Sequence, residues 1–414
     1  MISKIYNVFR RWTGLQYVLI GNRTKKKVAR GEKVKLVFIC QLPHVWSCIE
    51  SVYEEAIKDK VFDVYILAVP NKFENTEVDS DAYDFCKAHG YKVIDAYDRE
   101  KKEFFDLKKL EPDYVFFPRP YDYYLPKHYT SIEVSKYAKS CYVSYCYVAE
   151  GGEILETCYD KYFTSFCYFV FPDNDSTEQY CKNNHRLSLL FETKKIIRTP
   201  YPRFDLMKRW EGCEPEHWKI KKESVKKRII WTPRWATDKR MGATTFFEYK
   251  EFFLKFAEEH KDCDFMFRPH PLAFQHFIDT GHMTEEEVQA YKKICEAGSN
   301  TQIDERSEYL DSFASADILV SDMSGVMEDF LVTGSPLVFC SFEQEVNEAN
   351  KKLLDAFYIS HNEDEMREIL EMLIAGNDPK KEQRKEIVRN VLGECDGKNG
   401  KRILDYIRAD IGVL

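Results

Sequence analysis

The chain has 414 residues, 13 cysteines and a formal net charge of −8. One hydrophobic core rarely serves more than about 250–300 residues, so this length predicts two compact domains. The cysteines stand singly, without CxxC pairs or metal-ligand spacing, which favours buried free thiols in a reducing cytosol over a disulfide-rich secreted protein. No secretory signal pattern or apolar run of about 18 residues is present, so we expect a cytoplasmic protein that does not span a membrane.

Residues 1–30 form a basic segment in a chain that is otherwise acidic. The first acid is Glu32, and the preceding cations are Lys4, Arg10, Arg11, Arg23, Lys25, Lys26, Lys27 and Arg30. Apolar residues recur there at roughly helical spacing: Ile2, Ile5, Val8, Phe9, Trp12, Leu15, Tyr17 and Leu19. Such segments lie along anionic lipid surfaces, so we predict peripheral binding to the inner face of the cell membrane. The alternatives are a helix packed on the folded body or a flexible tail, and we expect no nucleic-acid partner because the acidic remainder offers no second basic face.

Residues 31–198 alternate between short apolar runs and helix-like segments, the pattern of a parallel sheet covered on both faces. The expected strands are KVKLVFIC (33–40), DVYILAV (63–69), YKVIDAY, the end of DLKKLEPDYVFFP, CYVSYCYV (141–148) and CYFVFP (167–172). The expected helices include Trp46–Lys58 and DAYDFCKAHG. We predict a doubly wound, Rossmann-like N-terminal domain.

Residues 199–414 repeat this α/β architecture. The expected strands are KRIIWTP (227–233), DFMF in DFMFRPHP, TQIDE, DILVSD (317–322) and PLVFC, with helices over FFEYKEFFLKFAEEH, TEEEVQAYKKICEAG, SEYLDSFASA and SGVMEDFLVTG. The proline-dense IIRTPYPRFD (196–205) is the expected linker. Two doubly wound domains facing across a cleft would bring together the carboxyl ends of their strands, where ligands bind.

The segment DILVSDMSGVMEDF carries the first candidate site. A buried strand ends at Ser321-Asp322, and Ser324 is placed as the N-cap of the following helix. Gly325 lets a ligand approach the backbone closely, and the free N–H groups of a helix N-terminus attract a diphosphate. The alternative is an ordinary capped turn between a strand and a helix.

The segment FRPHP carries the second candidate site. Its two prolines stiffen the turn after the strand DFMF and would hold Arg268 and His270 at the carboxyl end of that strand. Arginine grips phosphate bidentately, and histidine can donate a proton to a phosphoryl oxygen. The alternative is a solvated cation beside a structural histidine.

Together with TPYPRFD, WTPRW and ECDGKNGKRI, these segments resemble the CDP-glycerol glycerophosphotransferase family, which includes the teichoic acid polymerases. The resemblance implies a GT-B fold, in which a polymer hydroxyl attacks the β-phosphorus of a CDP-linked donor and CMP departs. It gives His270 and Arg268 the role of stabilising the diphosphate. It further assigns Ser324 and Gly325 to the diphosphate, Arg234 (with Thr232 and Pro233) and Arg203 (with Pro202 and Asp205) to donor binding, and Asp329, together with Asp304, to the nucleotide.

The departure from this family lies in the N-terminal half. Members commonly carry a His-Gly-Thr turn whose histidine is thought to be the base, whereas here CYVSYCYV runs into Ala149-Glu150-Gly151-Gly152. Glu150 can accept a hydroxyl proton. Two other candidates are His44, after the first strand, and Asp122, in the aromatic run PRPYDYYLPKHY (118–129), which would suit a polyol. With no DxD-type pair at a strand end, we expect neither a catalytic metal nor a cofactor.

The resulting prediction is an enzyme that moves glycerol phosphate, or ribitol phosphate, from a CDP-polyol to a lipid-linked or polysaccharide hydroxyl of a cell-wall or capsular precursor. A GT-B glycosyltransferase using a nucleotide sugar would use the same anion site. A nucleotide-sugar epimerase, and a non-catalytic nucleotide- or polymer-binding homologue, are the remaining alternatives.

Overall fold

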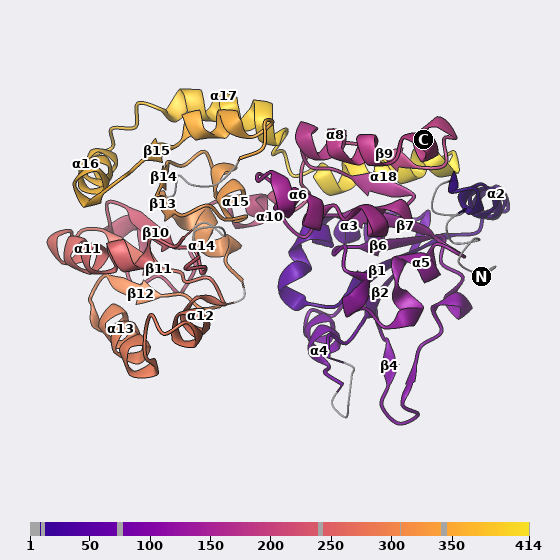
Figure 1. Ribbon diagram of the computed structural model, residues 1–414, viewed down its shortest axis with the longest axis horizontal. Coiled ribbons are helices and arrows are strands. Elements are labelled where there is room, and N and C mark those ends of the chain that lie inside the picture. Colours follow the sequence, from indigo (N-terminus) through magenta and orange to yellow (C-terminus); the bar gives the residue numbers. More distant parts are fainter. Residues whose placement is uncertain are drawn as a thin grey trace. The chain divides into compact units, whose positions relative to one another are not determined.

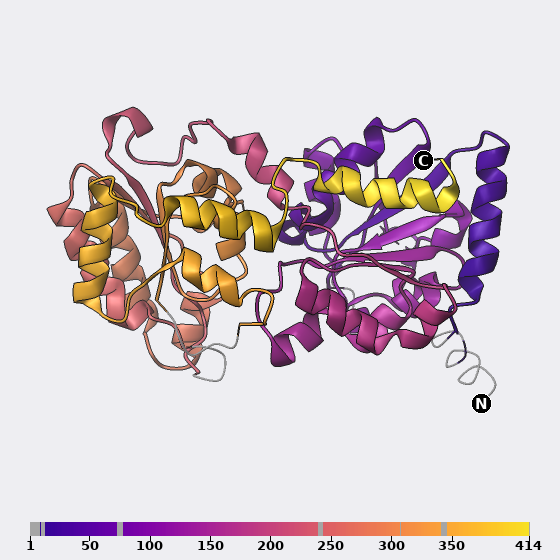
Figure 2. The same cartoon turned by 90° about the horizontal axis from the view of Figure 1, so that it is seen from above.

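The computed structural model describes residues 9, 13–72, 78–238, 243–306, 308–340 and 346–413. The chain divides into two compact units, Met1–Asp205 with Glu394–Leu414 (unit 1) and Leu206–Gly393 (unit 2). This division differs from the expected boundaries of 31–198 and 199–414, because the end of the chain returns to unit 1. There the helix α18 (Asn399–Ile411) packs against α3 (Ser47–Lys58) and buries Ile403, Ile407 and Ile411 (Figures 1 and 2).

Unit 1 is built on a seven-stranded parallel sheet in the order β3-β2-β1-β6-β7-β8-β9. Its strands are β1 (Val34–Cys40), β2 (Phe62–Ala68), β3 (Val93–Asp95), β6 (Tyr114–Phe117), β7 (Lys139–Val143), β8 (Phe169–Phe171) and β9 (Lys195–Ile196), beside a hairpin of β4 (Tyr97–Asp98) and β5 (Glu103–Phe104). The other helices are α2 (Gln16–Ala29), α4 (Asp81–Ala88), α5 (Ser131–Val134), α6 (Gly152–Cys158), α7 (Lys161–Ser165), α8 (Asp175–Asn184) and α9 (Arg186–Leu190).

Most strands of this sheet match the expected runs, but CYVSYCYV is strand only as far as Val143. Its neighbour β8 is short, and ladder pairing ends at Val143 and Phe171. Beyond that point, side chains instead of a neighbouring strand form hydrogen bonds with the backbone. The Asp173 carboxylate accepts from the Val148 N–H at 2.8 Å, and the Asn174 side-chain amide donates to the Val148 carbonyl at 2.9 Å. The residues between Val143 and Glu150 are therefore held as a loop at the carboxyl edge of the sheet.

Unit 2 contains a six-stranded parallel sheet in the order β12-β11-β10-β13-β14-β15. Its strands are β10 (Arg228–Thr232), β11 (Asp264–Phe267), β12 (Thr301–Ile303), β13 (Ile318–Ser321), β14 (Leu337–Phe339) and β15 (Tyr358–Ile359). Its helices are α11 (Phe246–Glu259), α12 (Ala273–Asp279), α13 (Glu285–Ala297), α14 (Leu310–Ser315), α15 (Met327–Leu331), α16 (Glu363–Ile374) and α17 (Lys381–Leu392), and α10 (Phe204–Met207) crosses the boundary between the units.

Strand order reverses once in each sheet, between β1 and β6 in unit 1 and between β10 and β13 in unit 2. The central strands are buried over almost their whole length, since helices cover both faces of a doubly wound sheet. Ligands of such sheets bind beyond the carboxyl ends of the strands at the reversal. The fold therefore predicts one ligand-binding position in each unit, beyond the carboxyl ends of the strands at the reversal.

The N-terminal helix α2 uses one face to pack on unit 1. Tyr17 and Ile20 are buried, and Lys27 pairs with the buried Asp113 at 3.1 Å. Arg23 donates to the carbonyls of Pro112 and Tyr137, both at 3.0 Å. The expected basic amphipathic segment is therefore, over Gln16–Ala29, also a helix packed on the body, while residues 1–8 and 10–12 lie outside the described part of the chain.

All thirteen cysteines are free and most are buried, which confirms the predicted thiols. Over the described ranges, no helix has the length and apolar character needed to cross a bilayer.

Candidate active site

The carboxyl ends of β10 and β13 are joined in unit 2 by one buried carboxylate. Asp322, directly after β13, accepts hydrogen bonds from the Arg234 N–H at 2.7 Å, the Thr245 N–H at 3.0 Å and the Thr245 hydroxyl at 2.6 Å. Between the same strand ends, the Thr232 hydroxyl donates to Ser321 Oγ at 2.8 Å. Burial raises the pKa of Asp322, and the bonds from Thr245 and Arg234 oppose that rise. These contacts fix the loop that carries Arg234 and the start of the turn that leads to Ser324-Gly325.

Arg234 lies beside the turn that follows β13. Its Nη1 donates to the Met323 carbonyl at 2.9 Å, and its side chain is half-buried. The structure therefore brings Arg234 next to the Ser324-Gly325 turn, 90 residues further along the sequence.

The Ser324-Gly325 turn is not the helix start expected from the sequence. Helix α15 begins at Met327, its N-cap is Val326, and the helix has five residues, all of them buried. Ser324 Oγ instead accepts from the Val326 N–H at 3.3 Å, and Gly325 is exposed. Ser324 therefore stabilises a turn that precedes the helix. The helix itself begins only at Met327, where the buried residues start.

Asp329, assigned to the nucleotide, is buried within α15. Its carboxylate accepts from the Tyr309 hydroxyl at 2.5 Å. This hydrogen bond occupies Oδ2 of the carboxylate.

Arg268 and Asp304 form an ion pair at the carboxyl ends of β11 and β12. Arg268 Nη1 lies 2.8 Å from Asp304 Oδ2, and Nη2 donates to the Arg306 carbonyl at 2.7 Å. Its guanidinium lies 5.2 Å from the centroid of the Tyr309 ring. Burial raises the pKa of Asp304, but hydrogen bonds from Arg306 and the charges of Arg268 and Arg306 outweigh it and hold that pKa below its usual value. Asp304 thus acts on Arg268 as a fixed counter-ion.

His270 is exposed two residues beyond Arg268. Its Nδ1 accepts from the Leu272 N–H at 3.2 Å, and its ring centroid lies 6.1 Å from that of Trp235. Because Nδ1 is the acceptor, we assign the proton of the neutral ring to Nε2, which makes that nitrogen a hydrogen-bond donor. Arg234, Arg268, His270 and the Ser324-Gly325 turn thus follow three neighbouring strands, β10, β11 and β13, at one edge of the sheet.

The three candidate bases follow β1, β6 and β7 of unit 1, which are adjacent strands. Both carboxylate oxygens of Asp122 are taken by Ser131, Oδ1 by its N–H at 2.6 Å and Oδ2 by its hydroxyl at 2.7 Å. Asp122 thus holds the start of α5. Glu150 is half-buried in the turn before α6, where Gly152 adopts a φ of 55° that a residue with a side chain rarely accepts. The His44 side chain reaches solvent but is partly surrounded by protein, and this partial loss of water, followed by the charges of Arg119 and Arg203, lowers its pKa.

Arg203 and its neighbours belong to unit 1 rather than to the donor sheet. Arg203 Nη2 donates to the Tyr145 carbonyl at 2.5 Å, and the Pro202 carbonyl accepts from the Ser51 hydroxyl at 3.1 Å. Asp205 accepts from the Gly400 N–H at 2.8 Å, and burial raises its pKa. This segment ties α18 and α3 to the end of unit 1.

Asp322 and Arg119 were missed by sequence reasoning. Asp322 stands directly after a buried strand, which is a signal for a ligand position, but its hydrogen bonds run to residues far away in the chain. Arg119 follows the buried strand 114–117 in the same way and donates to Gln41 Oε1 at 3.1 Å.

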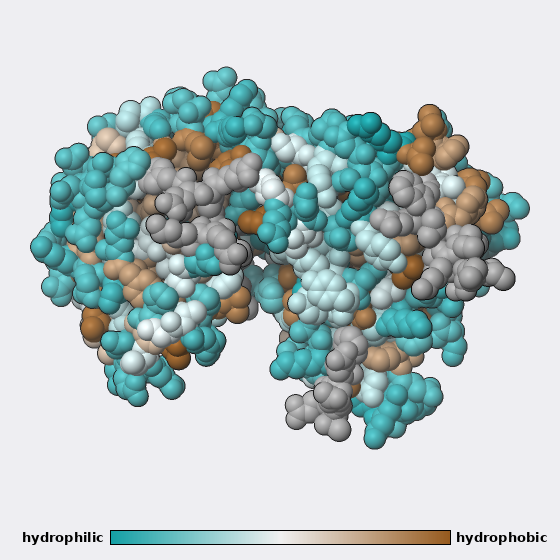
Figure 3. Space-filling model, viewed as in Figure 1, coloured by the Kyte–Doolittle hydropathy of each residue, from teal (hydrophilic) through white to brown (hydrophobic). Residues whose placement is uncertain are grey.

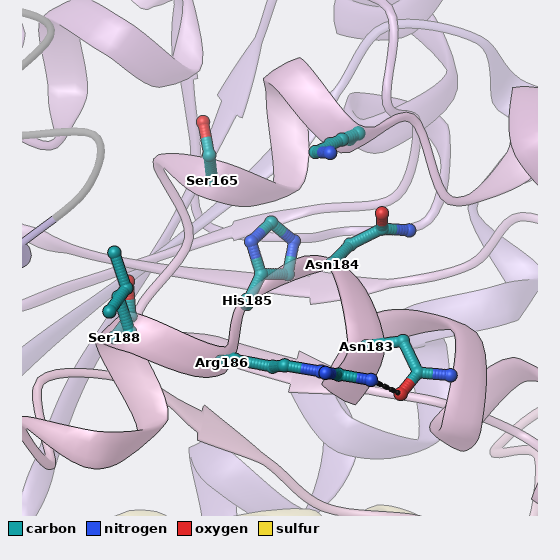
Figure 4. Close-up of a pocket in the computed structure, with 8 residues that line it drawn as sticks. Ser165, Asn183, Asn184, His185, Arg186 and Ser188 are labelled. Atoms are coloured by element: carbon teal, nitrogen blue, oxygen red, sulfur yellow. Dashed lines mark hydrogen bonds between the residues drawn. The ribbon is translucent and has the colours of Figure 1, made fainter.

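A separate pocket of about 240 Å³ lies in unit 1 among α7, α8 and α9, and contains no predicted site residue (Figure 4). It is lined by Lys161, Ser165, Asn183, Asn184, His185, Arg186, Leu187 and Ser188. His185 Nε2 is 2.9 Å from the Thr164 hydroxyl, and Arg186 donates to Asn183 at 3.1 Å. These elements lead into the amino ends of β8 and β9, away from the ligand edge of the sheet.

Comparison with known proteins places this geometry in a family. Solved structures similar to the chain include a UDP-N-acetylglucosamine 2-epimerase (TM-score 0.63, 13% identity, 92% of this chain and 97% of that one). They also include the UDP-GlcNAc 2-epimerase of Neisseria meningitidis bound to UDP-GlcNAc (TM-score 0.59, 12% identity, 91% of this chain and 100% of that one). A third is a histidine-to-alanine variant of the wall teichoic acid polymerase TagF (TM-score 0.53, 14% identity, 100% of this chain and 99% of that one).

At these identities the similarity shows the fold, which is GT-B as expected. No curated protein sequence matches the chain significantly. The family model for CDP-Glycerol:Poly(glycerophosphate) glycerophosphotransferase matches residues 164–409, more than half of the chain. The chain therefore belongs to the CDP-glycerol:poly(glycerophosphate) glycerophosphotransferase family and is an enzyme of that family.

Proposed function

We propose that the protein transfers a glycerol-phosphate or ribitol-phosphate unit from a CDP-polyol to a hydroxyl of a cell-wall or capsular polymer precursor, releasing CMP. The observation that carries the proposal is the edge of unit 2, where Arg234, Arg268 and His270 follow adjacent strands beside the exposed turn at Ser324-Gly325. Two guanidinium groups and a ring N–H suit a diphosphate, because such groups neutralise charge with defined geometry.

In this reaction the acceptor oxygen forms a bond to the β-phosphorus of the donor, and the bond from that phosphorus to the oxygen of CMP breaks. Phosphoryl transfer depends mainly on charge neutralisation and positioning. Arg268, held by Asp304, stabilises the charge on the phosphoryl oxygens, and His270 Nε2–H donates to the departing CMP. Glu150 or His44 accepts the proton of the acceptor hydroxyl, whereas Asp122 is less suited because Ser131 occupies both its oxygens.

A titration with CDP-glycerol, CDP-ribitol, CMP and UDP-GlcNAc, followed by phosphate analysis of the product, tests this proposal. We expect cytidine-selective binding and one phosphate in each new linkage. His270→Ala should lower turnover by about 100-fold or more, whereas His282→Ala, an exposed histidine beyond α12, should not change it. A preference for UDP-GlcNAc with no phosphate in the linkage would instead favour a glycosyltransferase. Selective donor binding without turnover on any acceptor would favour a binding protein.

We also propose that unit 1 docks on the anionic inner face of the cell membrane. Supporting this, α2 exposes Val18 and Leu19, and α9 with the residue after it exposes Leu187, Leu190 and Phe191. The chain next to each element comes together, since Thr193, three residues after α9, donates through Oγ1 to the carbonyl of Thr13, three residues before α2. Figure 3 shows hydrophobic side chains gathered at the end of unit 1 where α2 lies. The exposed cations flanking this surface are Lys25, Lys26, Lys161 and Arg186.

Sedimentation of the full chain with phosphatidylglycerol vesicles tests the docking surface. The double variant Leu19→Glu/Leu190→Glu should reduce binding about tenfold or more, because two inserted apolar groups are lost and two like charges face the lipid. Ile57→Glu on α3, another exposed apolar position, is the matched control and should bind like the unaltered chain. Equal binding of all three would contradict the proposal.

A further inference from the structure

Arg119 stands at the strand reversal of unit 1. It follows β6 by two residues, while Gln41 directly follows the paired strand β1. Arg119 Nη1 donates to Gln41 Oε1 at 3.1 Å, and Gln41 Nε2 in turn donates to the Tyr124 carbonyl at 2.6 Å. The guanidinium is therefore held by a neutral amide at the position where a doubly wound sheet binds its ligand.

The charge of Arg119 has no carboxylate counter-ion within 4 Å among the described residues. Its side chain is half-buried, with the guanidinium 5.3 Å and 5.1 Å from the ring centroids of Tyr121 and Tyr124. Burial lowers the pKa of Arg119, which means that its charged form is disfavoured there. Removing a cation from water without a partner costs free energy, so a bound anion would stabilise this arrangement.

Two other arginines of the chain, unlike Arg119, have carboxylate partners. Arg228 and Arg384, whose side chains are fully buried, each pair with a carboxylate, Glu214 and Asp378 respectively. The carboxylate nearest to Arg119 in sequence, Asp122, has both oxygens bound to Ser131. The missing counter-ion is thus a local feature of this strand end.

The surroundings of Arg119 are positive and aromatic. The charges of Arg119 and Arg203 both contribute to lowering the pKa of His44, after the larger effect of burial. Tyr123 is 73% exposed, and the Tyr121 hydroxyl lies 2.9 Å from that of Tyr145, which follows β7. Tyrosine faces pack well on C–H groups while their hydroxyls bind polar groups. A ligand in which an anion is joined to a small polyol would match both the positive charge and the aromatic side chains around Arg119.

We propose that Arg119, oriented by Gln41, binds a phosphodiester of a polyol phosphate chain, and that the tyrosines of residues 121–124 pack on the adjoining polyol. The free guanidinium nitrogens of Arg119 bind two oxygens of that phosphate as a fork. This inference rests on the proposed function, because it gives Arg119 and the tyrosines beside it a part in holding the acceptor of that reaction. Arg119 would then bind an internal phosphate of the acceptor chain and so position the terminal hydroxyl of that chain for reaction.

Calorimetric titration of the full chain with glycerophosphoglycerol, a soluble diester with one phosphate between two glycerols, tests the site. Inorganic phosphate and glycerol serve as the partial ligands. We expect the diester to bind more tightly than either, Arg119→Gln to weaken it about 10- to 100-fold, and Arg119→Lys to weaken it less. Arg408→Gln is the matched control, because that guanidinium pairs with Asp59 before the amino end of β2, and it should leave diester binding unchanged.

A thermal melt separates binding from a structural role. Without ligand, Arg119→Gln should melt at the same temperature as the unaltered chain or higher, since it removes an uncompensated charge. A lower melting temperature together with unchanged diester binding would overturn the proposal. Equal affinity for inorganic phosphate and the diester would overturn the assignment to a polyol chain.

Donor titrations distinguish this inference from the proposed function. Arg119→Gln should bind CDP-glycerol as the unaltered chain does, while the KM for a glycerol-phosphate oligomer rises. If CDP-glycerol is not bound or turned over but the diester still binds in an Arg119-dependent way, the proposed function fails and the binding site stands.

Discussion

Asp322 links the loop that carries the candidate donor residue Arg234 to the turn at Ser324-Gly325, and its replacement gives the sharpest test of this part of the site. Asp322→Ala leaves two backbone N–H groups, of Arg234 and Thr245, and the Thr245 hydroxyl without their acceptor. Each unsatisfied buried group costs about 1–3 kcal/mol, and relief of the buried carboxylate offsets part of the sum. We expect a loss of about 3–5 kcal/mol in the free energy of unfolding.

The isosteric change Asp322→Asn separates hydrogen bonding from charge. The amide oxygen can accept both N–H groups, while its NH₂ faces Thr245 Oγ1, which can also act as an acceptor. We therefore expect a loss below about 1 kcal/mol at pH 7. Burial raises the pKa of Asp322, so the native state binds more protons than the unfolded state, and stability from this group falls as pH rises through the folded pKa. Asp322→Asn should lack that decline.

Urea denaturation followed by circular dichroism, from pH 4 to pH 8, measures these differences, and turnover reports the site. Displacement of Arg234 by about 1 Å should lower turnover roughly 100-fold in Asp322→Ala. If Asp322→Ala is destabilised by less than 1 kcal/mol, or if Asp322→Asn loses as much as Asp322→Ala, then Asp322 does not hold the two loops together.

Three further predictions concern the donor arginine and the last helix. Arg268→Gln should lower turnover about 100-fold and Arg268→Lys about tenfold, measured at saturating donor, because lysine retains the charge and loses the fork; equal activity would contradict its role. Asp410→Ala should lower the free energy of unfolding by about 3–5 kcal/mol in urea, because it breaks the bonds from the hydroxyls of Tyr114 and Tyr168, both 2.6 Å, and leaves Lys139 buried without its partner. Gly400→Ala should destabilise by about 2–4 kcal/mol, since its Cβ would meet the Ser51 backbone at 2.5 Å, whereas the exposed Lys401→Ala should be neutral.

Much of the fold could be predicted from the sequence, because a parallel strand that is buried on both faces appears there as a short run of apolar residues. The runs 33–40, 63–69 and 227–233 match β1, β2 and β10 within one residue at each end. The strand ends then locate Arg268, His270 and Arg234, since polar residues directly after such runs lie at the ligand edge of the sheet. Their grouping at one edge of the sheet therefore follows from the order of apolar runs and polar residues along the chain.

The sequence by itself determined the α/β class, the two alternating halves and the family, because these depend on periodicities and motifs within short stretches of chain. Tertiary structure decided what depends on distant partners. It returned α18 to unit 1, where Asp410 meets Tyr114 and Lys139, and it started α15 at Met327 rather than at Ser324. Among the residues that the structure describes, it also left Arg119 without a carboxylate partner. Each outcome is set by burial and by hydrogen-bond partners far apart in the sequence, which no local pattern encodes.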